Sequence, residues 1–488
     1  METIVRNIGN DKQLFIDNWI VSDAWTAHRK IHQPAKHPAN PLITGDNEWE
    51  RDRVFVYGAV APRPSGGYRM WYNAVLDDTG RQGTGPSMQH YRVCYAESDD
   101  GIEWTKPNLG LYDWRGSTEN NLVIPEDAAN DFGQSLTNIT GAQSFSVLQE
   151  PGPAADDGLL HGFTLLNPSD VNEAICHLVS EDGIRWRRAP GGFPLITGHS
   201  DTPNNVIWNP TLGKYMCVMR PNVFANTDGG KRRIAISLSE DLVEWTQQEV
   251  VLFPDEADPD GVEHLYGMGV FPYEGMWLGT LEVYNDHTGT IEVQLAHSRD
   301  GLRWERLPVR EPLIPWGEEG SFDHSIIHSS VRPFIKDGRI WMYYDGTNAD
   351  HHAIYGWHTA SKGQRASIGL ATWRLDGFVS RSAYEEGYVL TRPFYCEGSR
   401  LLVNAKVAPR GKLTAEVLEI DTTSNDQLNS AATAGGHGRK DCVTFDEDSV
   451  ETEITWRHGA NLAPFLGKVI RLRFHLSYTD LYAFHIGR

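Results

Sequence analysis

The chain has 488 residues, of which 40% are hydrophobic and 22% charged, and its formal net charge is −21. This balance is typical of a globular protein, and the length favours two domains over one. The negative charge argues against a nucleic acid or an anionic membrane as a partner, because either phosphate surface would repel the chain.

The first residues and the cysteines favour a cytoplasmic location. The opening METIVRNIGNDKQLF lacks the basic start and apolar run of a signal peptide, and no apolar run reaches the length of a membrane span. The five cysteines are scattered and include no CxxC pair, which favours free buried thiols in a reducing compartment.

A short pattern, Ser-x-Asp-(Gly)-x-x-Trp, recurs along the chain and predicts a repeated tight turn. Its four clear copies span residues 98–104, 180–186, 239–245 and 298–304, and a degenerate fifth copy spans 373–378. Successive tryptophans of the first four copies lie 82, 59 and 59 residues apart. In each copy the Asp accepts backbone hydrogen bonds, the Gly permits the turn, and the Trp packs the next strand against its neighbour.

Each copy follows an alternating strand, and no segment has helical periodicity over a dozen residues, so we predict an all-β chain. Counting the copies predicts a five-bladed β-propeller. Its blades span roughly residues 42–115, 120–193, 196–252, 261–312 and 318–380. The propeller domain is expected to span residues 1–384, with the first 40 or so residues as a lead-in strand. Alternating segments from Glu385 onward predict a β-sandwich over residues 385–488.

Two segments carry a resemblance to glycoside hydrolase family 32 and to its relatives, families 43 and 68. Ser200-Asp201-Thr202-Pro203 opens a strand with a Trp, a turn and a second strand, in the order that follows the family's Arg-Asp-Pro motif. Glu263-His264 precedes LYGMGVFPYEGMWLGTL, as Glu-Cys precedes a strand, Phe-Pro and a Trp-containing strand in the family. The resemblance implies that Asp201 stabilises the transition state and that Glu263 is the general acid.

The nucleophile motif of family 32, Trp-Met-Asn-Asp-Pro-Asn-Gly, is absent from this chain. The corresponding first-blade segment contains Glu50 and Asp52, and the sequence does not choose between these two carboxylates. The chain therefore resembles a divergent member of the superfamily rather than a standard invertase.

Polar residues just before the innermost strand of each blade are expected to converge on the propeller axis. The predicted catalytic carboxylates are Glu50, Asp52, Asp201, Glu263 and Asp323. The predicted substrate-binding residues are Trp49, Asn138, Arg220, His264, Tyr266, His324, His328 and Arg332. His324 and His328 share one face of a strand, but no recognised ligand spacing surrounds them, so neither a metal nor another cofactor is predicted.

These residues favour a glycoside hydrolase, because glycoside cleavage needs a proton donor and a second carboxylate. The resemblance implies an exo-acting enzyme on a terminal sugar, such as a furanoside, of a small carbohydrate substrate. Two alternatives remain: a lyase that uses the axial histidines on an acidic sugar, and a non-catalytic sugar-binding propeller. The sequence leaves open whether the chain forms a homo-oligomer.

Overall fold

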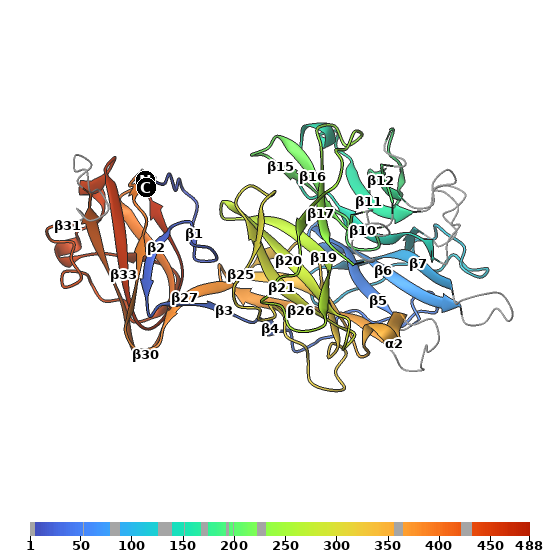
Figure 1. Cartoon of the computed structure of the whole chain (residues 1–488). Coiled ribbons are helices and arrows are strands. Elements are labelled where there is room, and N and C mark those ends of the chain that lie inside the picture. The colour runs from blue at the N-terminus through green and yellow to red at the C-terminus, as the bar shows by residue number, and fades with distance from the viewer. Residues whose placement is uncertain are drawn as a thin grey trace.

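A computed structural model shows a chain built almost entirely of β-strands (Figure 1). It describes residues 5–51, 53–78, 88–124, 139–150, 152–166, 174–191, 195–198, 200–221, 231–355, 365–420 and 432–488. Among these residues the one α-helix is the short α2, His351–Tyr355. The prediction of an all-β chain is confirmed. No helix among the described residues is both long and apolar enough to cross a membrane.

Three antiparallel sheets follow one another between residues 54 and 252. The first contains β5 (Val54–Pro62), β6 (Tyr68–Asp78), β7 (Met88–Ser98) and β8 (Leu122–Ile124), with β9 (Ile139–Gly141) parallel to β7. The second contains β10 (Gln143–Val147), β11 (Leu160–Leu166), β12 (Ala174–Ser180), β13 (Arg187–Arg188) and β14 (Ile196–Thr197). The third contains β15 (Asn205–Asn209), β16 (Lys214–Met219), β17 (Ile234–Ser239) and β18 (Glu249–Leu252).

Two further antiparallel groups of strands are joined by a single parallel pairing, Ile291 with Ile326. The fourth group contains β19 (Val262–Tyr273), β20 (Met276–Asn285), β21 (Thr290–Ser298) and β22 (Trp304–Arg306). The fifth contains β23 (Ile326–Ser329), β24 (Phe334–Lys336), β25 (Arg339–Thr347) and β26 (Ala366–Arg374). Its outer strand is β4 (Ala35–Lys36), which comes from the start of the chain and pairs with β26.

These five groups contact one another in a closed ring. β5 contacts β10, β10 contacts β15, and β15 contacts β19, while β20 contacts β23 and β23 returns to β5. The ring forms the right-hand body in Figure 1. Segments far apart in sequence therefore meet around one centre.

The repeated turn has the predicted hydrogen bonds. In the first copy Asp100 Oδ1 accepts from the backbone N–H groups of Ile102 and Glu103, at 2.8 and 2.9 Å. The Ser98 hydroxyl accepts from Gly101 N–H at 2.8 Å, and Gly101 has a φ of +80°. The copies at Asp182, Asp241 and Asp300 repeat this pattern. The predicted turn is confirmed.

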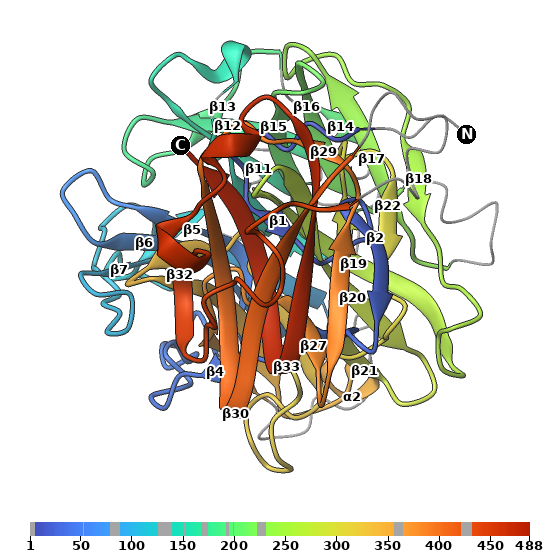
Figure 2. The same cartoon turned by 90° about the vertical axis from the view of Figure 1, so that its left-hand side faces the viewer.

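The last part of the chain forms a separate sheet on the left of Figure 1, seen face-on in Figure 2. Its long strands are β30 (Arg400–Glu419) and β33 (Val469–Gly487). The other C-terminal members are β27 (Val379–Ala383), β28 (Gly387–Thr391), β29 (Phe394–Tyr395), β31 (Ala432–Thr433) and β32 (Asp448–Ile454). Short 3₁₀ turns lie at Pro153–Ala155, Arg457–Gly459 and Ala463–Phe465.

Strands from the start of the chain complete this C-terminal sheet. They are β1 (Gln13–Leu14), β2 (Val21–Trp25) and β3 (His28–Ile31), which pair with β33, β28 and β27 respectively. The first 40 residues, predicted as a lead-in to the propeller, thus divide between this sheet and the ring. The division at residues 384 and 385 stays a prediction.

Candidate functional site

Polar side chains from the third, fourth and fifth groups of strands meet near the centre of the ring. We call them the axial cluster: Asp201, Arg220, Arg232, Tyr266, Glu282, His328, Asp345 and His351. Asp201 precedes β15 and Arg220 follows β16, whereas Tyr266 and Glu282 belong to β19 and β20. Pairing within each sheet, together with the contacts of β15 and β16 with β19 and of β20 with β23, brings the side chains together across long stretches of sequence.

Arg220 fixes one side of the cluster. Its guanidinium is buried, forms an ion pair with the Asp201 carboxylate, and donates to the carbonyl of Tyr266 at 2.7 Å. It also lies over the Tyr266 ring, with 4.8 Å between the guanidinium carbon and the ring centroid. Asp201 is thus held in place while its side chain stays 19% exposed.

Glu282 is the most perturbed carboxyl of the cluster. It is 1% exposed, and burial raises its pKa to about 7 even though the charges of His328 and Arg220 lower it. A glutamic acid in this environment is about half protonated at neutral pH. Its Oε2 atom has no hydrogen-bonding partner among the described residues.

The space beside Glu282 Oε2 depends on Gly267. A Cβ at Gly267 would lie 2.2 Å from Thr202 Oγ1 and 2.7 Å from Glu282 Oε2, so a larger residue would collide with both. Thr202 Oγ1 also lacks a hydrogen-bonding partner among the described residues. Two buried polar atoms without a partner among the described residues therefore lie against Gly267, and one of them belongs to Thr202, the residue directly after Asp201.

His328 and Asp345 form a buried pair on the other side of Glu282. His328 Nδ1 lies 2.8 Å from Asp345 Oδ2, and Asp345 Oδ1 accepts from Val56 N–H at 2.7 Å. Burial raises the pKa of Asp345, while the carboxylates of Asp345 and Glu282 outweigh burial and raise the pKa of His328. The Nε2 atom of His328 has no partner among the described residues, and the ring packs 4.7 Å from that of Tyr57.

Arg232 adds a positive charge to the cluster. Its guanidinium lies over Tyr266 at 5.0 Å and Tyr284 at 5.5 Å and forms no ion pair among the described residues. Burial and this arginine lower the pKa of His264 to about 4 and that of His351 to about 2, so both imidazoles are neutral. His351 Nε2 lies 3.1 Å from the Tyr266 hydroxyl.

Four predicted residues, Asp201, Arg220, Tyr266 and His328, thus belong to the axial cluster, and His264 borders it. Glu263 lies at the start of β19 with its side chain 56% exposed and paired with Lys231 at 2.9 Å. The hydrogen bond from Lys231 lowers the pKa of Glu263, which is the opposite of what a general acid needs.

The remaining predicted residues have partners elsewhere in the described structure. Glu50 is buried, accepts from the Tyr72 hydroxyl at 2.5 Å and pairs with Lys106 at 2.7 Å. Trp49 donates to Asn121 Oδ1. Asp323 pairs with Lys36 of β4, His324 lies 3.1 Å from the Ser321 carbonyl, and Arg332 pairs with Glu150. Asp52 and Asn138 lie outside the described residues.

Four members of the axial cluster were not among the predicted site residues. They are Arg232, Glu282, Asp345 and His351. Glu282 and Asp345 lie in the middle of second strands, MWLGTLEVYN and RIWMYYDGT, whereas the prediction considered residues before first strands. A single carboxylate inside an apolar strand was the available signal, because an unpaired charge is costly in such a place.

No group of three or more potential metal ligands occurs among the described residues.

Comparisons with known proteins give distant structural similarities. No family model matches the chain, and no curated protein matches its sequence. A β-1,2-mannobiose phosphorylase from Listeria innocua has 13% identity and a TM-score of 0.49 over 73% of this chain and 98% of that one. An N-acetylgalactosamine deacetylase from F. plautii has 14% identity and a TM-score of 0.46, over 72% of this chain and 96% of that one.

A third solved structure is described under the GH130 family of mannoside phosphorylases, which contains glycoside hydrolases that target β-1,2 mannosidic linkages. It has 15% identity and a TM-score of 0.45 over 75% of this chain and 96% of that one. The resemblance to family 32 stays a prediction. With TM-scores below 0.5, these similarities assign the chain to no family.

Proposed function

We propose that the ring is a five-bladed β-propeller followed by a β-sandwich, and that the axial cluster hydrolyses a glycosidic bond of an oligosaccharide. The observation that carries the proposal is Glu282, a buried carboxyl with a pKa of about 7 that is influenced by the same Arg220 guanidinium that binds Asp201. A raised and a fixed carboxylate are the pair of groups that glycoside hydrolysis requires.

In the proposed reaction the protonated Glu282 donates its proton to the oxygen of the leaving sugar as the glycosidic bond breaks. The Asp201 carboxylate, held by its ion pair with Arg220, stabilises the positive charge that develops on the sugar ring. Water then adds to the anomeric carbon and returns a proton to Glu282. No step uses a metal or cofactor.

The finer features of the substrate rest on the sequence resemblance. The segments that open at Ser200 and Glu263 resemble family 32, and they favour removal of a terminal, furanosidic sugar. Cytoplasmic location likewise stays a prediction.

The test compares Glu282→Gln with the wild-type enzyme on two kinds of substrate: natural disaccharides and p-nitrophenyl glycosides. We expect Glu282→Gln to slow cleavage of the disaccharide by about 10²–10⁴-fold, the usual contribution of a general acid. p-Nitrophenol is a good leaving group that needs little protonation, so its release should fall far less.

The pH profile adds an independent readout. Because Glu282 must carry a proton, wild-type cleavage of disaccharides should fall as the pH rises through about 7, and aryl glycosides should show a weaker decline. Glu263→Gln and Glu292→Gln are the controls; Glu292 is a partly buried carboxyl of β21 outside the axial cluster and accepts from Gln294 at 2.6 Å. Loss of activity in Glu263→Gln but not in Glu282→Gln would return the acid role to Glu263, and no cleavage of any glycoside would favour a sugar-binding propeller.

A second candidate is lyase activity on an acidic sugar, favoured by the Arg232 guanidinium, which forms no ion pair among the described residues. A carboxylate on the sugar would compensate this charge, and His328 Nε2, which has no partner among the described residues, would take the proton. An unsaturated product that absorbs ultraviolet light would identify this route. Assays of glycoside cleavage should be run with and without inorganic phosphate. A sugar phosphate product would show that phosphate, rather than water, attacks the sugar.

A further inference from the structure

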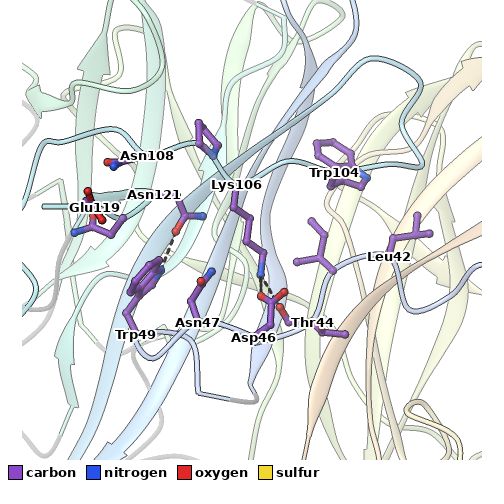
Figure 3. Close-up of a pocket in the computed structure, with 13 residues that line it drawn as sticks. Leu42, Thr44, Asp46, Asn47, Trp49, Trp104, Lys106, Asn108, Glu119 and Asn121 are labelled. Atoms are coloured by element: carbon purple, nitrogen blue, oxygen red, sulfur yellow. Dashed lines mark hydrogen bonds and ion pairs between the residues drawn. The ribbon is translucent and has the colours of Figure 1, made fainter. Parts of the chain in front are cut away.

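A pocket lies apart from the axial cluster, next to the first sheet, and is lined by residues from the segments 42–49 and 104–121. Its volume is about 400 Å³, and its walls include Trp49, Trp104, Asn108 and Glu119 (Figure 3). Trp49 and Trp104 stand on opposite sides, with Lys106 and Asp46 between them. We call this cavity the rim pocket. Its size falls in the range of small-molecule sites.

Lys106 forms a fixed floor for the rim pocket. Its ammonium group donates to the Thr44 carbonyl at 2.7 Å and to Glu50 Oε2 at 2.7 Å, and it pairs with Asp46. An ammonium group has three N–H donors, and these three acceptors use all of them. The floor is therefore closed to an anion, and the exposed carboxylates of Asp46 and Glu119 make the opening negative.

Trp49 is held in place before any ligand arrives. Its indole N–H donates to Asn121 Oδ1 at 2.8 Å, and its carbonyl accepts from Arg92 at 3.2 Å. Asn121 in turn donates to the Tyr72 hydroxyl and the Tyr95 carbonyl, both at 2.8 Å. A ring fixed in this way binds without losing rotamer freedom.

Trp104 is fixed on the opposite wall. Its ring meets Tyr343 edge to face at a centroid distance of 5.6 Å, and it remains half-buried like Trp49. The two indoles give apolar faces, and Asn108 and Glu119 give exposed amide and carboxylate groups beside them. Apolar faces combined with hydrogen-bonding groups match a sugar ring, which has apolar C–H faces and a rim of hydroxyl groups.

We propose that the rim pocket binds one neutral sugar residue of a saccharide chain, as a binding site remote from the axial cluster. The closed floor and the negative opening disfavour uronic acids and phosphorylated sugars. Glu50 and Asn121 connect the pocket to Tyr72 of the first sheet, and the described hydrogen bonds of this network reach no member of the axial cluster. The proposal goes beyond the catalytic function, and it does not depend on whether the axial cluster acts by hydrolysis or as a lyase.

The test measures retardation of the protein in gels that contain soluble mannan, arabinan or inulin. The double variant Asn108→Ala/Glu119→Ala removes two exposed polar groups of the pocket. Loss of two hydrogen bonds should weaken binding by about tenfold or more. Asn108→Trp fills the pocket without removing a buried contact and should have the same effect.

Three controls separate the rim pocket from catalysis and from folding. Glu103→Ala/Thr118→Ala changes exposed residues that do not line the pocket and should bind like the wild type. Glu282→Gln should keep full retardation, and the rim variants should cleave aryl glycosides at the wild-type rate. The proposal is wrong if no gel retards the wild type, if the rim variants bind normally, or if Glu282→Gln alone abolishes binding.

Discussion

At the scale of single residues, the axial cluster combines predicted and unpredicted groups for a clear reason. Asp201 and Tyr266 lie at or near the starts of inner strands, where flanking sequence identifies them. Glu282 enters the cluster from the second strand, and its position depends on the pairing of Gly267 with Glu282 across β19 and β20. That pairing includes register shifts between Val262 and His264 and between Leu265 and Gly267, which no sequence pattern fixes.

Glu282→Gln should make the folded protein more stable at high pH. The folded pKa of about 7 lies above the ordinary value of 4.5, so the folded state binds the proton more tightly and loses stability as the pH rises between these values. Above pH 7 the ionised side chain costs about 3 kcal/mol, which Gln avoids. Urea unfolding should therefore give similar free energies at pH 4.5 and a stabilised variant at pH 8. An equal difference at both pH values would contradict the raised pKa.

At the scale of elements, the repeated turn was predictable because its interactions are local. Each Asp bonds residues two and three positions ahead, so seven letters of sequence contain the whole turn. The contacts between each turn and the neighbouring sheet could not be predicted in this way, because they join residues far apart in sequence. Trp71 of the first sheet donates to the carbonyl of Gly183 in the second at 2.6 Å, across 112 residues. Repetition therefore revealed how many turns exist, and the strand contacts decide how they close into a ring.

Gly183→Ala should destabilise the protein more than a matched glycine substitution. Gly183 has a φ of +80°, and a Cβ there would lie 2.7 Å from Trp71 Cζ2. We expect a loss of about 2–3 kcal/mol from strain and overpacking. Gly158→Ala is the control, because Gly158 has a φ of +78° with nothing within 4 Å of the new Cβ, and it should cost about 1 kcal/mol. Equal losses in denaturant melts would show that the contact with Trp71 adds nothing.

At the scale of the whole molecule, one buried carboxylate joins the ring to the C-terminal sheet. Asp376 accepts from Lys12 at 2.9 Å, from the Tyr273 hydroxyl at 2.7 Å, and from Asn404 at 3.0 Å. A shared core continues the junction, because Leu14 and Ala483 pack in the same cluster as Phe271 and Met276. The sequence predicted two units but not this junction, because Lys12 lies 364 residues and Tyr273 103 residues from Asp376.

Asp376→Ala should therefore destabilise both units together. Removing a buried carboxylate leaves the ammonium of Lys12 without its closest partner, and we expect a loss of about 3–5 kcal/mol. Asp448→Ala removes a junction carboxylate that is 48% exposed, and it should cost at most about 1 kcal/mol. Scanning calorimetry checks both values. Two separated transitions in the wild type would mean that the units unfold independently of this contact.

The pairing of β4 with β26 also dictates the order in which the molecule can be made. β4 leaves the ribosome among the first strands, but its partner β26 emerges only after most of the ring has been synthesised. Until then β4 has no sheet to join. The ring therefore closes late, and incomplete chains expose an open strand edge to aggregation and proteolysis. Truncated nascent chains that end before Ala366 should consequently depend on chaperones, whereas chains that extend past Arg374 should close.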